Sequence, residues 1–462
     1  MSAEAAPTGA ALTGDAFTGR MPAHAGDLAM ETHGIAPVPA GNRYGTPRRL
    51  FTVWFAPQVN MTVVFTGTLG AMLGLGFWPA LLAIVVGTVL GCLAVGYLST
   101  WGPRTGTAQL PNARMAFGST VRAVAVIQWL SSIAWDGLVG LFGGQALAAL
   151  TGLPFWLSVL IVLATQGTVG VFGYELIHRL QAVMSVLLFV TFATFAVRLI
   201  GEHAVITPPT LSGAEFAGAF VLEVTIALSL AISWASYASD YSRYLPPQTA
   251  PAAVFGYTFG GLALSSIGAQ TVGLAAADLL TDQTAEGVRT VMGGGLPGAV
   301  ALLAITLGSV SANAMNDYSG SLALQTVGVR LRRPVSAAIV ATVAFGLIMW
   351  LHAGDLVDRF QSLLLFVSYW IPAFVAIIAI DWRRRSAGRE VVNPAEENTP
   401  RTDAVAALAS FVVAFAAAIP FMHTDLMVGA VASRLHGADL AYFVNFLVAA
   451  ALYGGYRAVA DR

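Results

Sequence analysis

Small and polar residues interrupt one long apolar stretch of the sequence, residues 220–246. Ser233, Trp234 and Ser236 stand where the apolar run ends, and a charged aromatic signature, Asp240 to Pro246, follows them. A membrane-spanning helix needs about 20 mostly apolar residues, and its backbone loosens only where it lines a cavity or is buried in protein. Trp234 is therefore a candidate platform for a substrate. The alternative is a tightly packed helix whose small residues admit a neighbouring helix.

A similar break is expected in the first apolar stretch, at Phe55-Ala56-Pro57-Gln58-Val59-Asn60. A proline inside a span frees the carbonyl about four residues back and bends the helix. Freed carbonyls are suitable ligands for a small hard cation, and the amides of Gln58 and Asn60 can read the edge of a heterocycle. An ordinary proline kink is the alternative.

Asp136 is an ionisable group well inside the apolar run 121–150. Such groups are costly in a membrane and usually face a cavity or a partner. Trp135 beside it can stack on a flat ring, as aromatic faces do with any nucleobase. Core packing is the alternative for this tryptophan. Glu223, in the run 216–239, is a further candidate for a proton relay.

A polar series, residues 309–319, follows another apolar run. The hydroxyls of Ser309 and Ser311, with nearby carbonyls, can complete an oxygen cage for a cation. Asn316 can pair with a nucleobase edge, and Asp317 can accept an N–H or carry a proton. The alternative is a polar helix end at the cytoplasmic surface.

The composition is that of a polytopic membrane protein. Of the 462 residues, 56% are hydrophobic and only 10% are charged, whereas a soluble protein has about 25% charged residues. The net charge of -1 gives no reason to expect a nucleic acid partner. The single cysteine, Cys92, excludes an internal disulfide and a cysteine-rich metal site. The sequence shows no catalytic triad, metal-ligand spacing or phosphate loop, so no cofactor is expected.

Apolar runs predict twelve membrane spans, and they are 50–74, 77–100, 121–150, 153–172, 176–200, 216–239, 252–276, 294–316, 335–352, 360–380, 404–422 and 439–458. Cytoplasmic loops retain arginine and lysine, and every basic residue here is arginine. With both termini in the cytoplasm, only Arg198, Arg289, Arg359 and Arg434 fall outside.

The two expected breaks lie in the first and the sixth spans. Paired broken helices in corresponding positions of two halves point to a transporter site. Residues 46–200 and 216–380 each hold five spans, and repeats with an odd number of spans have opposite topology. The sequence therefore predicts a ten-helix transport core, 46–380, built as an inverted repeat.

Three segments lie outside this core: an N-terminal segment, a polar segment after the tenth span, and a C-terminal segment. Residues 1–45 are rich in alanine, glycine, proline and threonine and have no apolar signal-peptide region, so a disordered cytoplasmic tail is expected. Residues 381–403, with three consecutive arginines, are expected to be a cytoplasmic linker. The last two spans lie within 404–462.

The order of the motifs resembles the nucleobase–cation symporter-1 family, in its purine–cytosine permease branch. The residues that carry the resemblance are Trp54, Asn60, Thr66-Gly67-Thr68-Leu69-Gly70, Gly102-Pro103-Arg104-Thr105-Gly106, Arg114, Phe117-Gly118, Trp135, Gln145, Trp234, Asp240-Tyr241-Ser242-Arg243-Tyr244, Asn316, Tyr318 and Ser319. The resemblance implies a leucine-transporter-type fold with 5+5 inverted repeats and two C-terminal helices. It also implies alternating access and cation-coupled uptake of a flat nitrogenous ring.

Carried over by position, the resemblance implies a substrate site between Trp135 and Trp234. The other residues assigned to this site are Val59, Asn60, Val139, Ser233, Ser236, Asn316 and Asp317. A sodium site would use the carbonyls of Phe55 and Gln58 and the region Val310 to Ser311.

Two positions depart from the family pattern. Relatives often carry a polar group around Val139 and a second asparagine where Asp317 stands. The acid at Asp317, with Asp136 beside Trp135, makes proton coupling an alternative to sodium coupling.

We expect a symporter of the cytoplasmic membrane that imports cytosine or a purine with Na⁺ or H⁺. Transport needs no catalytic residue, because a ligand shifts the populations of two states by its differential affinity. The expected partners are the lipid bilayer and the small heterocycle, with no obligate protein partner. One alternative is a symporter of this fold for hydantoin, allantoin or a thiamine-precursor pyrimidine. Another is a membrane enzyme or channel that uses Asp136, Glu223 and Asp317 as an acid cluster.

Overall fold

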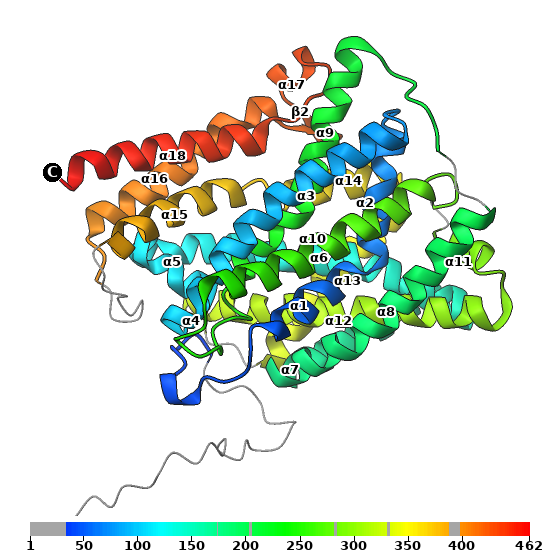
Figure 1. Cartoon of the computed structure of the whole chain (residues 1–462), viewed down its shortest axis with the longest axis horizontal. Coiled ribbons are helices and arrows are strands. Elements are labelled where there is room, and N and C mark those ends of the chain that lie inside the picture. Colours follow the sequence, from blue (N-terminus) through cyan, green and yellow to red (C-terminus); the bar gives the residue numbers. More distant parts are fainter. Residues whose placement is uncertain (1–33, 173, 203–205, 281–283, 330–332, 388–397) are drawn as a thin grey trace, which may run out of the picture.

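The computed structural model describes residues 34–172, 174–202, 206–280, 284–329, 333–387 and 398–462, which are almost wholly helical (Figure 1). The only strands in these ranges are β1 (His423–Thr424) and β2 (Met427–Val428), an antiparallel pair. The helices are, in chain order, η1 (Ala40–Asn42), α1 (Arg48–Phe55), η2 (Ala56–Gln58), α2 (Met61–Met72), α3 (Phe77–Ser99), α4 (Trp101–Thr105), α5 (Gln109–Phe117), η3 (Gly118–Thr120), α6 (Val121–Thr151), α7 (Phe155–Phe172), α8 (Tyr174–Glu202), α9 (Gly213–Ile232), η4 (Ser233–Tyr237), α10 (Pro251–Ala275), α11 (Thr284–Val291), α12 (Gly295–Val327), α13 (Arg333–His352), α14 (Leu356–Phe366), α15 (Ile371–Ala387), α16 (Arg401–Ala418), η5 (Ile419–Phe421), α17 (Ala430–Arg434) and α18 (Ala441–Ala460).

The helices follow the predicted spans in order. Ten helical segments of the described residues are long and apolar enough to cross a membrane. Two shorter apolar helices, Met61–Met72 and Phe155–Val169, stand at the first and fourth predicted spans. The all-helical membrane fold is therefore confirmed, and the twelve-span count is consistent with it.

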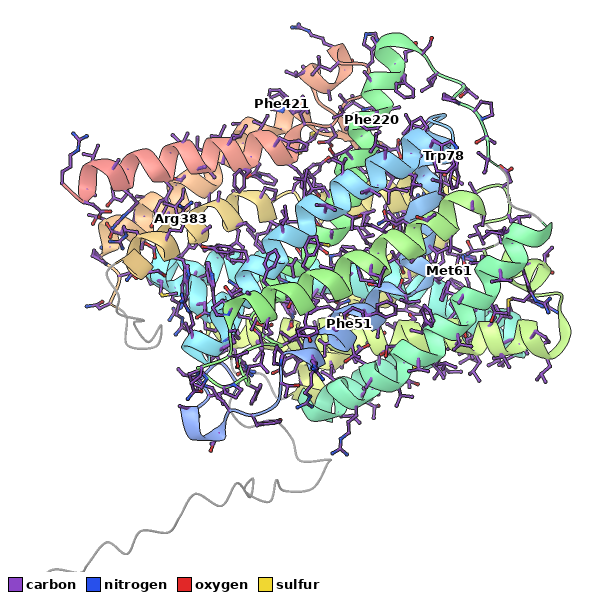
Figure 2. The ribbon with its side chains drawn as sticks, viewed as in Figure 1. Phe51, Met61, Trp78, Phe220, Arg383 and Phe421 are labelled. Carbon is purple, nitrogen blue, oxygen red and sulfur yellow. The ribbon has the colours of Figure 1, made fainter. Side chains whose placement is uncertain are left out.

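Both predicted helix breaks are present. In the first span, α1 runs into the turn η2, and the chain is extended at Asn60, where φ is -138° and ψ is 167°. Pro57 stands in that turn. In the sixth span, α9 ends at Ile232 and the 3₁₀ turn η4 carries the chain past Trp234. Figure 2 labels Phe51 of α1 and Met61 of α2, one on either side of the first break.

The packing of the helices follows the symmetry of an inverted repeat. Helix α6 packs along α12, α3 packs along α9, and α10 packs on α1 and α2. Counted as spans, the third packs on the eighth, the second on the sixth, and the seventh on the first. Exchange of the two halves turns the second–sixth contact into the seventh–first contact. The arrangement is that of the predicted 5+5 repeat.

Two glycines allow the closest approach between these helices. A Cβ atom on Gly273 of α10 would lie 1.7 Å from the carbonyl oxygen of Val64 in α2. A Cβ atom on Gly87 of α3 would lie 2.2 Å from the carbonyl oxygen of Val224 in α9. Small residues at such contacts let the backbones of membrane helices meet. Both broken helices are therefore held directly against an unbroken neighbour.

Part of the predicted tail, residues 34–45, has a defined structure. Residues 1–33 of the predicted tail lie outside the described residues. The remaining segment, 34–45, is placed by hydrogen bonds, because the Val38 N–H donates to the Gly106 carbonyl at 2.9 Å and Arg43 Nη1 donates to the Pro103 carbonyl at 2.7 Å. The prediction that the tail extends to residue 45 is therefore wrong, since residues 34–45 pack on α4 and on Gly106, which follows it.

The predicted linker 381–403 also proves shorter. Helix α15 continues to Ala387. Its last turns are stabilised by Asp381, which accepts hydrogen bonds from Arg385 Nε at 2.6 Å and from Arg384 Nη2 at 3.2 Å. Helix α16 already begins at Arg401, and residues 388–397 lie outside the described residues. Helices α16 and α18 pack together and α18 also contacts α15, so the last two spans lie along one edge of the bundle (Figure 1).

Candidate functional site

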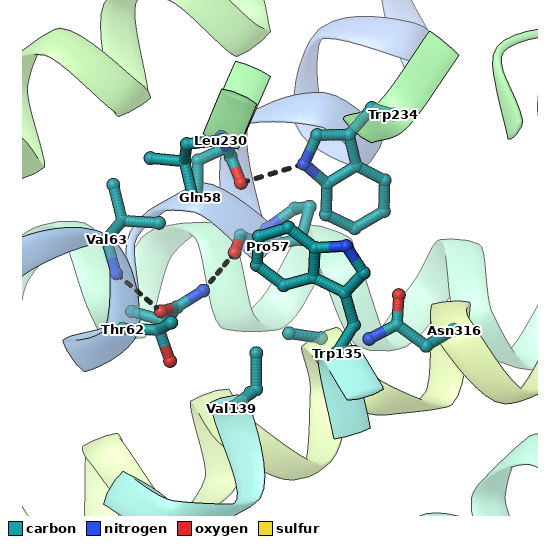
Figure 3. Close-up of a pocket in the computed structure, with 11 residues that line it drawn as sticks. Pro57, Gln58, Thr62, Val63, Trp135, Val139, Leu230, Trp234 and Asn316 are labelled. Atoms are coloured by element: carbon teal, nitrogen blue, oxygen red, sulfur yellow. Dashed lines mark hydrogen bonds between the residues drawn. The ribbon is translucent and has the colours of Figure 1, made fainter. Parts of the chain in front are cut away.

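A small pocket lies where the two helix breaks meet α6 and α12 (Figure 3). Its lining residues are Pro57, Gln58, Asn60, Thr62, Val63, Trp135, Val139, Leu230, Trp234, Ala312 and Asn316. The cavity measures about 10 Å³, which is space for about one water molecule. A flat ring can enter only if these side chains or the broken helices move apart.

Trp234 is held in place by side chains of the first span and by Tyr237 of its own span. Its indole Nε1 donates a hydrogen bond to Gln58 Oε1 at 3.1 Å, and Gln58 Nε2 donates to Ser266 Oγ at 2.5 Å. The Trp234 ring also meets the rings of Trp54 and Tyr237 edge-on, at centroid distances of 5.7 and 5.8 Å. These contacts fix the indole, and a fixed aromatic face costs less conformational entropy when a ring binds.

Trp135 reaches the same pocket from α6. Its indole lies beside Trp234 and Pro57 in Figure 3, and only 8% of each tryptophan is exposed. Val139 lies four residues after Trp135, on the same face of the helix. The structure thus brings together, from the third and sixth spans, the two aromatic residues that the sequence singled out.

Asn316 presents an amide to the pocket from α12 (Figure 3). Its Nδ2 donates to Asn313 Oδ1 at 3.1 Å, and Asn313 Nδ2 donates in turn to Gln166 Oε1 at 2.8 Å. Asn313 also donates to the carbonyl of Asp136 at 3.2 Å. This chain of amides orients Asn316 before any ligand arrives.

Asn60 lines the pocket, but the helix break already uses its amide. Its Oδ1 accepts a hydrogen bond from the Val63 N–H at 3.1 Å, which caps α2, and its Nδ2 donates to the carbonyl of Pro57. The carbonyl of Pro57 is therefore satisfied within the break. A second lone pair on Oδ1 is what remains for a ligand.

Four predicted substrate residues do not line the pocket. The hydroxyl of Ser233 donates to the Leu230 carbonyl at 2.7 Å, and that of Ser236 donates to the Ser233 carbonyl at 3.1 Å. Val59 is buried beside the pocket, and Asp317 turns toward Asp136. Hydroxyls that bond their own helix are a common outcome where a helix loosens, and they leave no donor for a substrate.

The structure brings two of the three predicted acids together. The carboxyl of Asp136 faces that of Asp317 across the contact between α6 and α12. Glu223 lies elsewhere, in α9, where a Cβ atom on Gly70 would come within 3.1 Å of its carboxyl carbon. A single cluster of three acids is therefore not formed, and the acid-cluster hypothesis for an enzyme or channel loses its geometric basis.

The predicted sodium residues lie in neighbouring elements. The turn η2, which follows Phe55 and contains Gln58, contacts both α12 and α8. The carbonyl of Ser311 accepts a hydrogen bond from Gln181 Nε2 of α8 at 2.9 Å. The Ser311 hydroxyl is buried and has no hydrogen-bond partner among the described residues, whereas Val310 offers no side-chain oxygen. The Ser311 hydroxyl is therefore one suitable ligand for a cation, but Val310 beside it has no hydroxyl that could serve as a second ligand.

Sequence reasoning missed several lining residues and one positioning residue. Leu230 and Ala312 lie four residues before Trp234 and Asn316, so the helical repeat around each predicted residue points to them. The side chain of Gln58 lines the pocket, as expected of an amide that reads a heterocycle, and its Oε1 also accepts the hydrogen bond that positions Trp234. No sequence signal links Gln58 to Trp234, which lies 176 residues later.

Comparison with known proteins matches residues 37–445 to the family described as "Permease for cytosine/purines, uracil, thiamine, allantoin". The purine-cytosine permease fcyB of Emericella nidulans is 26% identical over 480 residues, which cover 98% of this chain and 93% of that protein. The vitamin B6 transporter TPN1 of Saccharomyces cerevisiae is 23% identical over 381 residues, 76% of this chain and 65% of that protein.

A solved structure shares the fold. It is that of Mhp1, a nucleobase-cation-symport-1 family transporter in a closed conformation with bromovinylhydantoin bound. The TM-score is 0.73 with 18% sequence identity, and the match covers 93% of this chain and 96% of that one. This match confirms the predicted transporter fold.

Proposed function

Because the chain belongs to the family of permeases for cytosine and purines, uracil, thiamine and allantoin, we propose that it is a symporter that imports a nucleobase with Na⁺ or H⁺. Cytosine or a purine is the proposed substrate. Members of this family are permeases and not enzymes. The proposed location is the cytoplasmic membrane, with both termini in the cytoplasm, as the arginine pattern of the loops favours.

The observation that carries this proposal is the pocket between Trp135 and Trp234. Both indoles border it, and Val63, Val139 and Leu230 contribute apolar side chains to its wall. Such a pocket suits a flat aromatic ring, and stacking on an aromatic side chain contributes about 1–3 kcal/mol per base. The oriented amide of Asn316 is the proposed reader of the ring's polar edge.

The positions of the breaks support alternating access. The first and sixth spans meet the pocket at loosened backbone, whereas the third and eighth spans pass it as continuous helices, α6 and α12. In the proposed cycle the broken helices rock against α6 and α12 around the ring. The ring contributes by its differential affinity for the outward-open and inward-open states.

Uptake of radiolabelled cytosine into proteoliposomes tests the proposal. We expect accumulation under an imposed Na⁺ gradient or an imposed H⁺ gradient, and its collapse by an ionophore. Adenine, hypoxanthine, uracil, allantoin, hydantoin, a thiamine-precursor pyrimidine and pyridoxine serve as competitors. Absence of transport for every one of these rings, in vesicles that hold folded protein, contradicts the proposal. Preference for a hydantoin or allantoin would keep the fold and mechanism but change the substrate.

Removal of the Trp234 ring tests the site. We expect Trp234→Ala to abolish uptake, because the loss of one stacking face costs about 1–3 kcal/mol and frees the pocket wall. The matched control is Trp78→Ala in α3, because Trp78 is 65% exposed and does not line the pocket. Normal uptake by well-folded Trp234→Ala protein would contradict the assignment of this pocket as the substrate site.

A further inference from the structure

A larger groove lies at the end of the helix bundle that carries the C-terminus. It measures about 610 Å³ and is lined by Tyr97, Thr100, Arg104, Pro251, Ala252, Phe255, Trp382, Arg383 and Ser386. These residues come from the second, seventh and tenth spans, and Figure 2 labels Arg383 near the end of α15. In the proposed orientation this end faces the cytoplasm. None of these residues lines the pocket at the helix breaks, so the proposed transport makes no use of them.

Two arginines bring positive charge to this groove. Arg104 and Arg383 are both exposed, and neither makes a hydrogen bond or an ion pair within the part of the chain that the structure describes. No aspartate or glutamate is among the residues that line the groove. A guanidinium presents five N–H donors in a fixed fork that matches the oxygens of a phosphate or a carboxylate. The groove therefore offers two cationic forks to an anion.

The arginines that follow Arg383 in the sequence are already paired within the protein. Arg384 Nη2 and Arg385 Nε donate to Asp381 at 3.2 and 2.6 Å. Arg385 Nη2 also donates to the carbonyl of Met115 in α5 at 2.6 Å. Two of the three consecutive arginines are therefore engaged in structural contacts, whereas the charge of Arg383 is left for a ligand.

Packed aromatic rings hold together the helices that carry the two arginines. Trp382, which directly precedes Arg383, stacks on Trp101 of α4, with ring centroids 4.4 Å apart and 9° between the planes. Tyr97 of α3 meets the Trp101 ring edge-on at 5.7 Å. Because these contacts join α3, α4 and α15, the backbone positions of Arg104 and Arg383 are fixed relative to each other. Tryptophan and tyrosine are also the residues enriched at the headgroup level of membranes.

The seventh span forms another wall of the groove. Phe255 of α10 lines the groove and stacks on Phe259, one turn further into the span, with ring centroids 5.6 Å apart and 9° between the planes. A Cβ atom on Gly96 of α3 would lie 2.9 Å from the Phe255 ring. The Phe255 ring therefore lies directly against α3, and this wall of the groove is apolar.

A row of exposed apolar side chains on α3 leads to the groove. Its members are Leu82, Val86, Leu90 and Leu93. Each follows the last by three or four residues, so they share one face of the helix, and Tyr97, Thr100 and Arg104 continue the same spacing. Residues 77–105 are long and apolar enough to cross a membrane, so this exposed face lies against acyl chains. A ligand that brings apolar chains and an anionic group to the same place is a phospholipid.

We propose that this groove binds an anionic phospholipid of the cytoplasmic leaflet. The guanidinium groups of Arg104 and Arg383 hold the headgroup phosphate, and the acyl chains lie on the exposed face of α3. Basic pockets between membrane helices on the cytoplasmic side bind anionic headgroups. Since no acid lines the groove to balance a choline or ethanolamine group, a headgroup with net negative charge is favoured. The lipid bridges the second and tenth spans, a role that goes beyond the proposed transport.

Native mass spectrometry of the full-length protein in detergent tests this site. Phosphatidylglycerol is titrated into protein freed of phospholipid, and the apparent Kd of the first bound lipid is measured. Phosphatidylcholine with the same acyl chains tests the headgroup charge, and glycerol phosphate tests for a soluble anion. The variants are Arg104→Gln and Arg383→Gln, each of which removes one charge and keeps a polar side chain. Arg122→Gln, at an exposed arginine in the first turn of α6, is the matched control.

We expect the wild type and the control to bind phosphatidylglycerol in preference to phosphatidylcholine. Each variant should bind phosphatidylglycerol about tenfold more weakly, as for the loss of one hydrogen bond to a charged group. Without added phospholipid both variants should unfold at the wild-type temperature, because neither arginine has a partner within the described residues.

Four results would overturn the lipid site. They are wild-type affinity in both variants, equal binding of phosphatidylcholine, an equal loss in the control, and glycerol phosphate binding as tightly as phosphatidylglycerol. The last result would assign the groove to a soluble anion. Because the test involves no uptake, its failure would leave the proposed function intact.

Discussion

The two helix breaks look alike in the sequence but are stabilised in different ways. The backbone of the first break is closed locally, because Asn60 caps α2 and also bonds the carbonyl of Pro57, while the Gln58 side chain reaches Ser266 and Trp234. The sixth break depends on distant segments. Its Ser239 hydroxyl donates to the Leu98 carbonyl at 3.0 Å, and its Ser242 hydroxyl donates to the Ser99 carbonyl at 2.7 Å.

Arg243 extends this dependence to the start of the described chain. It is fully buried, with Nη1 donating to the Gly34 carbonyl at 2.6 Å and Nη2 donating to the Tyr318 hydroxyl at 2.8 Å. The two breaks therefore differ in how a structural change reaches them. A break closed by its own residues is little affected by movement of other spans, whereas a break that is hydrogen-bonded to several spans moves with them. A transporter that rocks around its breaks can use the second kind to couple the cytoplasmic side to the pocket.

The largest effect is expected from Arg243→Ala in the sixth break. Each hydrogen bond to a charged group contributes about 1.5–3 kcal/mol, so loss of two should destabilise the fold by about 3 kcal/mol or more. Thermal unfolding in detergent measures this loss. Arg104→Ala, at an exposed arginine, is the matched control and should unfold like the wild type. An unchanged unfolding temperature for Arg243→Ala would show that the sixth break is as self-contained as the first.

An intermediate effect is expected from Gln58→Leu, which cuts the link between the two breaks. Trp234 loses the acceptor of its indole N–H, and one hydrogen bond of about 1.4 kcal/mol corresponds to a tenfold change in affinity. We expect KM for the transported ring to rise about tenfold, and kcat to change less. The control is Gln248→Leu, at an exposed position. A KM equal to the wild-type value would show that Trp234 is fixed by its aromatic neighbours alone.

The smallest effect is expected from Asn60→Ala in the first break. The lost cap of α2 costs about 1 kcal/mol of stability, because the Val63 N–H loses its acceptor. Thermal unfolding should show a smaller shift than for Arg243→Ala. Asn60→Ser keeps a capping oxygen and should recover most of the loss. If Asn60→Ala instead proved as damaging as Arg243→Ala, the contrast between the two breaks would fail.

Much of the fold was predictable from the sequence, because apolar runs and helix-breaking residues act locally. The spans appear in the predicted order, and both breaks fall at the expected residues, Pro57 and Trp234. Trp135, Trp234 and Asn316 were picked from residue type and motif order, and the structure places all three on one pocket.

Tertiary structure alone decided where the remaining polar groups point. Ser233 and Ser236 turn onto their own helix, and Asp317 turns to Asp136 rather than to the pocket. Residues 34–45 pack although their composition resembles that of a disordered tail. These outcomes depend on which distant segment supplies a partner for each polar atom.

By itself, then, the sequence determined a membrane protein with twelve apolar runs and two broken helices, because hydrophobicity and helix breaks depend on neighbouring residues in the sequence and not on contacts with distant segments. Only the fold decided that Gln58 holds Trp234, that Glu223 stands apart from Asp136, and that Asp317 turns to Asp136. The physical reason is that each of these contacts joins residues from different spans. Their distance is fixed when the two halves pack together, and no local pattern records it.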